Sequence, residues 1–255
     1  MRPSLPTLPW LMPGDPFPPI ESAWGPDSDA PGLLAAGGDL SAATLTQAYR
    51  HGIFPWFSSG QPLLWWSPDP RMVLQVAQFR FHRSLRKTVL RFRNAPEHEV
   101  RFDSAFADVI TQCARTPRNG QNGTWILAEM VQAYTELHRL GVAHSVETWV
   151  QGQLVGGLYC VAIGRAVYGE SMFSHATDAS KIALAALVGF CRAHGILQID
   201  CQQNTRHLAS MGAREMPRVL FQAQMAQAQQ QPAPNWQFSP LYWDHVSTDQ
   251  STQRD

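Results

Sequence analysis

One stretch of the sequence decides the fold, ASKIALAALVGFCRAHGILQIDCQQ (residues 179–203). Its first part is predicted to be a helix that ends at Gly195, since glycine commonly terminates helices. Ten apolar residues in a row, 182–191, indicate that this helix is buried, and they fall well short of the ~20 residues that a membrane span needs. Residues 197–203 then have the pattern of a strand. A buried helix that leads directly into a strand is typical of helices packed on a sheet.

The segments on either side of this stretch continue the alternation of helix and strand. In chain order we expect helices at 41–52, 103–116 and 128–140, strands at 145–150, 153–161 and 166–173, and a further helix from Thr205 onward. The strands at 145–150 and 153–161 are separated by Gln151-Gly152 and should form a hairpin. The pattern predicts an α/β (α+β) fold with a mixed central sheet.

Changes in composition divide the chain. Nine prolines fall in the first 31 residues, which excludes a continuous helix or a central strand there. We therefore expect a Pro-rich extension (1–30), a small N-terminal domain (31–72), a larger domain (73–232) and a C-terminal tail (233–255). Because six of the ten residues 222–231 are Gln, we interpret this end as a fraying helix followed by a loose extension.

The charge balance excludes a general attraction to polyanions or membranes. The 255 residues contain 20 Lys or Arg and 20 Asp or Glu, so the formal net charge is zero and any such binding needs a local patch. Prolines interrupt the N-terminus, no secretory signal is visible, and we expect a cytoplasmic, monomeric protein without a membrane partner. The four cysteines form no CxxC pair and are interpreted as free thiols, with no structural zinc.

One such local patch is present, because residues 71–96 contain seven Lys or Arg and no Asp or Glu. Within it, Arg83, Arg86 and Lys87 have helical spacing. A solvated basic face is the usual explanation for such a run. In a chain of zero net charge, however, the concentration indicates phosphate binding, and we favour nucleic acid as the partner. Some of the nine Trp side chains could stack on an unpaired base, although such residues more often belong to the core.

Two strands carry polar residues that suggest a site. Alternation places Asp200 and Gln202 on one face of the strand Ile199-Asp200-Cys201-Gln202, and Glu170 lies in an otherwise apolar strand, where an unpaired carboxylate is costly. Each could simply face water. If both strands border one cleft, two carboxylates and an amide converge there and suit a cationic or amine substrate. The sequence has no P-loop, GxSxG or HExxH motif, so nucleotide hydrolysis, a serine hydrolase elbow and metalloprotease chemistry are not indicated.

Nine segments of the chain form an ordered set of motifs. They are PGLLAAGGDLS (31–41), AYRHGIFPWF (48–57), PLLWWSPDPRMVL (62–74), GTWI (123–126), AHSVETW (143–149), LVGGLY (154–159), GESMFS (169–174), ASKIAL (179–184) and IDCQ (199–202). In their order and spacing they resemble the leucyl/phenylalanyl-tRNA protein transferase family, and the resemblance covers roughly residues 30–222. Departures from the family pattern include Cys160, Val167, Leu187 and Gln198.

The resemblance implies an acetyltransferase-like (GNAT) larger domain and transfer of Leu, Phe and less readily Met from aminoacyl-tRNA to the N-terminal Arg or Lys of acceptor proteins. Such transfer marks the acceptor for degradation and implies no cofactor and no metal. By the family pattern, the catalytic residues are Asp200, Gln202 and Glu170. The substrate-binding residues are Trp56 and Trp125 for the terminal adenosine, with Met172, Phe173 and Ile199 for the transferred side chain. Arg83, Arg86 and Lys87 match the basic cluster that meets tRNA.

For the chemistry, we expect Gln202 to orient the attacking amine while Asp200 polarises Gln202 and stabilises the ammonium. Two other functions remain open at this point. One is a GNAT-type N-acyltransferase that uses acyl-CoA, and the other is a noncatalytic RNA-binding module.

Overall fold

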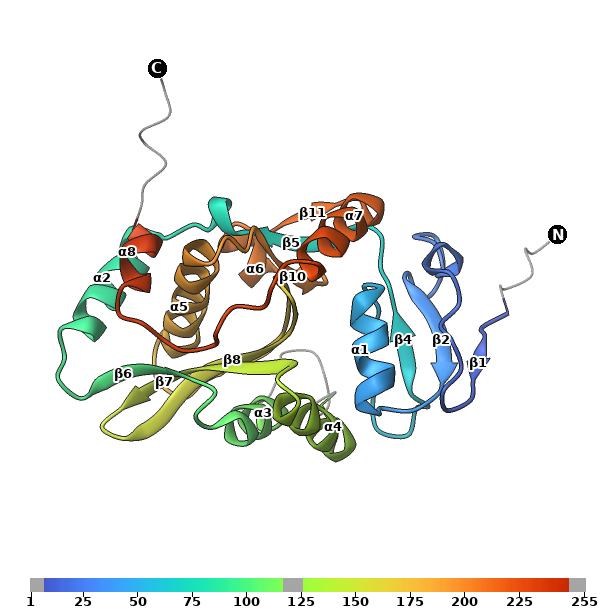
Figure 1. Ribbon diagram of the computed structural model, residues 1–255, viewed down its shortest axis with the longest axis horizontal. Helices are drawn as coiled ribbons and strands as arrows, with labels where there is room; N and C mark the ends of the chain where they lie inside the picture. Colours follow the sequence, from blue (N-terminus) through green and yellow to red (C-terminus); the bar gives the residue numbers. More distant parts are fainter. Residues whose placement is uncertain (1–6, 117–125, 248–255) are drawn as a thin grey trace, which may run out of the picture.

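The computed structural model describes residues 7–116 and 126–247 and contains two sheets, one in each domain (Figure 1). The small domain has a four-stranded sheet of order β1-β2-β4-β3, in which β1 runs parallel to β2 and the other pairs are antiparallel. Its elements are β1 (Trp10–Leu11), the 3-10 helix η1 (Ile20–Ser22), β2 (Leu33–Gly37), α1 (Ala42–Arg50), β3 (Phe54–Pro55) and β4 (Leu64–Trp66).

The large domain is built on a seven-stranded sheet of order β11-β5-β10-β9-β8-β7-β6. Only the β9–β10 pair is parallel, so the sheet is mixed. Its first elements are β5 (Arg71–Gln75), η2 (Val76–Gln78), α2 (Arg83–Arg93), β6 (His98–Phe102), α3 (Phe106–Arg115), α4 (Ala128–Arg139) and β7 (Ala143–Val150). The remainder are β8 (Gln153–Ile163), β9 (Ala166–Ser174), α5 (Ala179–Ala193), β10 (Gln198–Gln202), α6 (Arg206–Ser210), β11 (Arg214–Met216), α7 (Arg218–Gln229) and α8 (Tyr242–Ser247).

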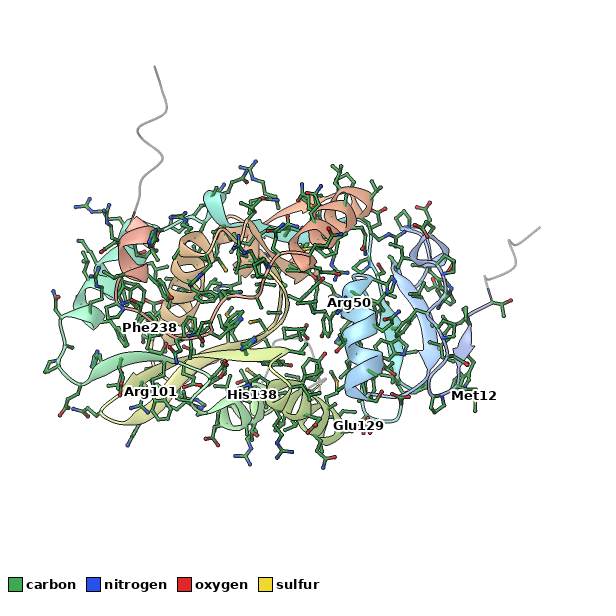
Figure 2. The ribbon with its side chains drawn as sticks, in the orientation of Figure 1. Met12, Arg50, Arg101, Glu129, His138 and Phe238 are labelled. Atoms are coloured by element: carbon green, nitrogen blue, oxygen red, sulfur yellow. The ribbon has the colours of Figure 1, made fainter. Side chains whose placement is uncertain are left out.

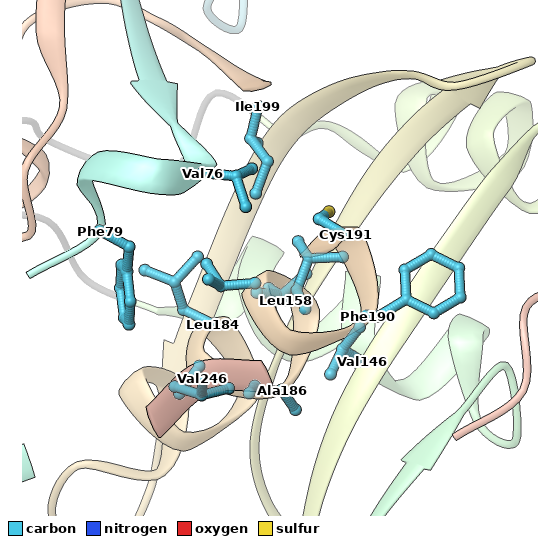
Figure 3. Packing of buried hydrophobic residues seen from close by; sticks show 14 of the residues in the cluster. Val76, Phe79, Val146, Leu158, Leu184, Ala186, Phe190, Cys191, Ile199 and Val246 are labelled. Atoms are coloured by element: carbon cyan, nitrogen blue, oxygen red, sulfur yellow. The ribbon is translucent and has the colours of Figure 1, made fainter. Parts of the chain in front are cut away.

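Helices cover both faces of the large sheet, as Figure 1 shows, with α5 on one face and α3 and α4 on the other. On the α5 face, Leu158 and Ile199 pack with α5, α2 and α8 (Figure 3). On the opposite face, Tyr159 and Tyr168 pack with α3, α4, α7 and α1 of the small domain. The two domains therefore share one of the two cores, and the predicted α+β fold with a small N-terminal domain and a mixed sheet is confirmed.

The apolar run at 182–191 forms the centre of the buried helix α5, and the strand β10 follows it as predicted. Eleven of the fifteen residues of α5 are buried, as the apolar run predicts, and Gly195 follows the helix with a φ of 66°, a left-handed conformation that glycine adopts without strain. At the start of α1, the Ser41 side chain accepts a hydrogen bond from the Thr44 amide and so caps the helix.

The two ends of the described chain compare differently with expectation. The Pro-rich segment contributes β1 at the edge of the small sheet, in agreement with the exclusion of a central strand, and Figure 2 shows Met12 at the outer edge of that domain. The prediction of a loose C-terminal extension is wrong for residues 233–247. Trp236 is only 8% exposed, and its ring stacks on His144 at 4.0 Å. The Gln-rich segment is the ordered helix α7, because Phe221 and Met225 give it a buried face. The expected domain boundary near residue 72 falls inside β5.

No helix among the described residues is long and apolar enough to cross a membrane.

Candidate active site

A cavity of about 540 Å³ lies beside β9, β10 and α5. This volume is in the range of about 300–1,000 Å³ that is usual for small-molecule sites. Most of the wall is apolar, and Leu158, Leu184 and Ile199, which come from three different elements, are labelled in Figure 3. The two acidic residues of the lining, Glu170 and Asp200, come from β9 and β10. The cavity can therefore bury an apolar side chain while polar groups remain next to it.

The cavity lies at the point where β9 and β10 stop pairing. Their register ends with Ile199 opposite Val167 and Asp200 opposite Tyr168, although both strands continue. In β9, Glu170 is a bulge residue, since Gly169 pairs with Cys160 and Ser171 already pairs with Tyr159. A bulge bends its strand and re-aims the following side chains.

The bulge at Glu170 has a direct effect on the cavity wall. Tyr168 belongs to the core on the α4 face, whereas Met172 packs against the core on the α5 face. Regular alternation would have put these two residues on the same face. The extra residue therefore turns Met172 into the cavity and leaves Glu170 at the split between the strands.

Two neighbouring side chains hydrogen-bond one oxygen of the Glu170 carboxyl and leave the other without a hydrogen bond. Its Oε1 accepts hydrogen bonds from the Tyr49 hydroxyl and from Gln202 Nε2, both at 2.7 Å. Its Oε2 is buried and has no hydrogen-bond partner among the described residues. Burial raises the pKa of Glu170 from 4.5 to about 8, the bond from Tyr49 opposes this rise, and the negative charge of Asp200 adds to it.

Two tyrosine hydroxyls, those of Tyr49 and Tyr134, form a hydrogen-bonded chain that ends on the Glu170 carboxyl. Burial holds the pKa of Tyr49 and of Tyr134 well above the usual range, so both hydroxyls stay protonated. Because Tyr49 donates its only hydroxyl proton to Glu170, the adjacent Tyr134 hydroxyl must donate to Tyr49. Tyr49 comes from α1, so the small domain contributes directly to the site.

Asp200 is fully buried and paired with Arg71. Arg71 Nε and Nη2 bind the two carboxylate oxygens of Asp200 at 2.8 and 2.6 Å, and Nη1 donates to the Gly52 carbonyl. Both residues are 1% exposed or less. We expected Asp200 to polarise the Gln202 side chain, but its Oδ1 instead accepts a hydrogen bond from the Gln202 backbone amide at 2.9 Å.

The backbone at Gln202 departs from regular strand geometry, and this departure brings the Gln202 side chain into the site. The β10–β5 ladder shifts between Asp200 and Gln202, so the predicted alternation of these two residues is wrong. Gln202 has a φ of 61°, in the left-handed region that is uncommon for residues other than glycine. Its amide nitrogen is bound to Glu170, which leaves Oε1 as the atom available to a substrate.

The other predicted substrate residues are distributed unevenly. Met172 and Ile199 line the cavity. Phe173 does not, since it is 1% exposed and packs in the core on the α3 face, where the strand pleat after the bulge directs it. Trp56 is half-buried in the small domain, with its ring 5.4 Å from that of Trp66. Trp125 lies outside the described residues.

The three predicted basic residues all lie exposed on α2. Arg83, Arg86 and Lys87 share the outer side of this helix, while Leu85 and Val89 are buried. The N-terminal end of α2 adjoins α6, because His82 bonds the Ser210 carbonyl, and α6 contributes Leu208 to the cavity wall. The basic surface thus continues from an element that borders the cavity.

Sequence reasoning missed Tyr49, Tyr134 and Arg71. Arg71 was counted in the basic stretch, and the strand-like RMVLQ pattern at its position was the only signal that it is buried. In the described part of the chain, no group of three or more His, Cys, Asp or Glu side chains could hold a metal ion.

Comparison with known proteins identifies the family. Residues 73–226 match the model of the leucyl/phenylalanyl-tRNA protein transferases, and residues 38–69 match the model of the N-terminal domain of the same proteins. The chain belongs to the leucyl/phenylalanyl-tRNA protein transferase family. It is therefore an aminoacyltransferase.

Relatives of this family match almost the whole chain. The leucyl/phenylalanyl-tRNA protein transferase of Polaromonas is 64% identical over 241 residues, which cover 94% of each chain. The one from Albidiferax ferrireducens is 59% identical over 246 residues, covering 96% of this chain and 97% of the relative. A solved structure of a functionally unknown conserved protein from Staphylococcus epidermidis has a TM-score of 0.39 at 9% identity over 72% of this chain and 68% of that one, too distant to inform function.

Proposed function

We propose that this protein transfers Leu, Phe and less readily Met from aminoacyl-tRNA to the N-terminal Arg or Lys of acceptor proteins in the cytoplasm, and so creates a degradation signal. The observation that carries the proposal is the apolar cavity with a buried, partly unpartnered carboxyl beside it. The cavity suits the side chain of the transferred residue, and the free Glu170 Oε2 suits an incoming amine.

Burial of the transferred side chain supplies selectivity. Transfer of a Leu, Phe or Met side chain from water into an apolar cavity contributes about 1.5–3 kcal/mol. Small or charged side chains gain little or are penalised there, so the cavity favours large apolar residues. Leu158, Leu184 and Ile199 offer such a wall without a hydrogen-bonding group.

In the reaction, the acceptor amine attacks the ester carbonyl, the new C–N bond forms, and the C–O bond to the tRNA ribose breaks. The ammonium loses two protons. One ends on the ribose oxygen, and in this proposal Glu170 takes the other and releases it to solvent. A carboxyl with a pKa of about 8 suits this step, because an α-amine has a pKa of about 8 and the proton moves between them at little cost in free energy.

The residues around Glu170 orient the reactants. Gln202 Oε1 can accept a hydrogen bond from the amine, which places the nitrogen lone pair toward the ester. Tyr49 and the Gln202 amide nitrogen fix Glu170 in one position. The protein then acts mainly by positioning, which can supply several kcal/mol in a reaction of two bound substrates.

An acyl-CoA donor is disfavoured by the segment between β9 and α5, where such a donor's pyrophosphate would need free backbone amides. The amides of His175 and Ala176 already bond the Val155 carbonyl, and the Ser180 amide bonds the Ser174 hydroxyl. The Asp178 carboxylate also lies there, bound to Lys181, and would repel a phosphate.

One assay tests the proposed function against its rivals. The protein is incubated with a peptide that begins with Arg and with either labelled Phe-tRNA or labelled acetyl-CoA. We expect label in the peptide from Phe-tRNA only, and much less in a matched peptide that begins with Ala. Label from acetyl-CoA alone would establish the acyl-CoA reaction instead. Absence of label with both donors would favour a noncatalytic RNA-binding function.

A further inference from the structure

We propose that Arg71 is a positioning residue for peptide transfer. In this proposal Arg71 fixes the orientation of the Asp200 side chain, and Asp200 in turn holds the Gln202 backbone. The negative charge of Asp200 then takes no direct part in the reaction. The inference rests on the proposed function, because the rate that it concerns is that of Phe transfer. It assigns a role to a buried ion pair that links β5, β10 and the small domain.

All three nitrogen atoms of the Arg71 guanidinium donate hydrogen bonds within the protein. Nε and Nη2 form a two-pronged contact with Asp200, and Nη1 binds the Gly52 carbonyl at 3.0 Å. The Cζ atom of the guanidinium lies 4.8 Å from the ring centroids of Phe54 and Phe221. Such a planar fork matches a carboxylate in one orientation only, so the pair fixes how the Asp200 side chain is turned.

The orientation of Asp200 matters because its side chain also holds the end of β10. The Asp200 Oδ1 atom that Arg71 Nε binds is also the acceptor for the Gln202 backbone amide. This is an Asx-type turn, in which a carboxylate binds a backbone group two residues ahead. It supports Gln202 in its left-handed conformation, at the bulge in the ladder with β5.

From Gln202 the contacts continue to the proposed reacting groups. The backbone held by Asp200 directs the Gln202 side chain, whose Nε2 binds Glu170 Oε1 at 2.7 Å. In contrast, Asp200 is 0% exposed and has both oxygens bound by Arg71. Both carboxylate oxygens of Asp200 are thus already bound, whereas Glu170 Oε2, which is also buried, accepts no hydrogen bond from any described residue.

A positioning role and a charge-dependent role of Asp200 predict opposite results for a variant in which Arg71 and Asp200 are both replaced by neutral residues. In the double variant Arg71→Met/Asp200→Asn, no charge is left buried and unpaired, and the Asn side-chain oxygen can still accept from the Gln202 amide. If Asp200 only positions Gln202, this variant keeps most of the activity. If the negative charge takes part in the reaction, the variant is as inactive as Asp200→Ala, which lacks both the charge and the acceptor.

The test measures single-turnover Phe transfer to a peptide with N-terminal Arg. We expect Arg71→Met to slow transfer by about 100-fold or more, with Phe-tRNA binding unchanged, and the double variant to recover to within about tenfold of wild type. The matched control is Arg192→Met, because Arg192 also donates hydrogen bonds to backbone carbonyls, those of Val76 and His245, but away from the site. It should lower stability without slowing transfer.

Equal inactivity of the double variant and Asp200→Ala would overturn the proposal, and so would an unchanged rate in Arg71→Met. If Arg71→Met does not fold, Arg71→Lys replaces it, because Lys keeps the charge but not the fork, and the same loss is expected. Crystal structures give a readout that is independent of activity. We expect the Gln202–Glu170 contact to persist in the double variant and to be lost in the single variant. Its persistence in both would contradict the inference even if the wild-type protein transferred no Phe.

Discussion

Replacement of Glu170 by Gln should change how the free energy of unfolding depends on pH. The carboxyl has a pKa of about 8 in the folded protein against an ordinary value of 4.5. Between these two values the folded chain binds a proton that the unfolded chain has released. The stability that this group contributes is therefore complete below pH 4.5 and is lost as the pH rises through about 8.

The expected magnitude is set by the same two values. At about 1.4 kcal/mol for each pKa unit, the interval from 4.5 to about 8 corresponds to roughly 5 kcal/mol for keeping Glu170 ionised in the folded protein. Gln has the same shape, and its oxygen can accept from Tyr49 and Gln202 as Glu170 Oε1 does. Glu170→Gln should thus be close to wild type near pH 5 and more stable by about 3–5 kcal/mol near pH 9.

Urea unfolding followed by Trp fluorescence at the two pH values measures this difference. Since both proteins share all other titrating groups, their contributions cancel in the comparison. Glu129→Gln is the control, because Glu129 is exposed on α4 and labelled in Figure 2, and it should behave alike at both pH values. An equal difference between Glu170→Gln and wild type at pH 5 and pH 9 would refute the assignment of a buried, high-pKa carboxyl.

Three further changes test other parts of the account. Replacement of the exposed α2 residues Arg83, Arg86 and Lys87 by Glu should weaken tRNA binding. The slope of the logarithm of the binding constant against the logarithm of the salt concentration should fall in magnitude by about 0.9 for each lost phosphate contact. An unchanged slope in filter binding would exclude this surface as the tRNA-binding site. Leu187→Phe should narrow the cavity and reduce the ratio of kcat/KM for Phe transfer to kcat/KM for Leu transfer by about tenfold. Leu197 is 76% exposed and lies outside the cavity, so Leu197→Phe should leave this ratio unchanged. Equal effects of the two substitutions would contradict the role of the cavity. Trp236→Ala should lower the free energy of unfolding, measured with urea, by about 3–5 kcal/mol. Trp10→Ala, at a residue that is 65% exposed, should lower it by less than about 0.5 kcal/mol. Similar small values for both variants would show that the C-terminal segment is not part of the core.

The fold was predictable where the local pattern and the tertiary packing agree. The apolar run of α5 predicted a buried helix because ten consecutive apolar residues leave no polar face for water, and Gly195 marked its end. The C-terminal segment could not be predicted in this way. Trp236 enters the core from a stretch without periodicity, through its contact with His144, and such a long-range contact leaves no local signal.

The site was predictable as a set of polar residues but not as a geometry. Asp200, Gln202 and Glu170 do come together, yet the reason is two strand bulges, each of which adds a residue that alternation cannot account for. For the same reason Phe173 was placed in the pocket although it faces the opposite core. The partner of Asp200 is far away in sequence at Arg71, so the burial of this pair depends entirely on how β5 and β10 are arranged.

The most direct test of the account is the single-turnover rate of Phe transfer from labelled Phe-tRNA to a peptide with N-terminal Arg, compared between wild type and Glu170→Gln. Loss of a proton acceptor that is in contact with the amine should lower this rate by about 100-fold or more, since general bases contribute on the order of 10²–10⁴. Phe-tRNA binding should stay unchanged, because the apolar cavity wall is intact. A rate for Glu170→Gln within roughly threefold of wild type would contradict the central role given to this carboxyl.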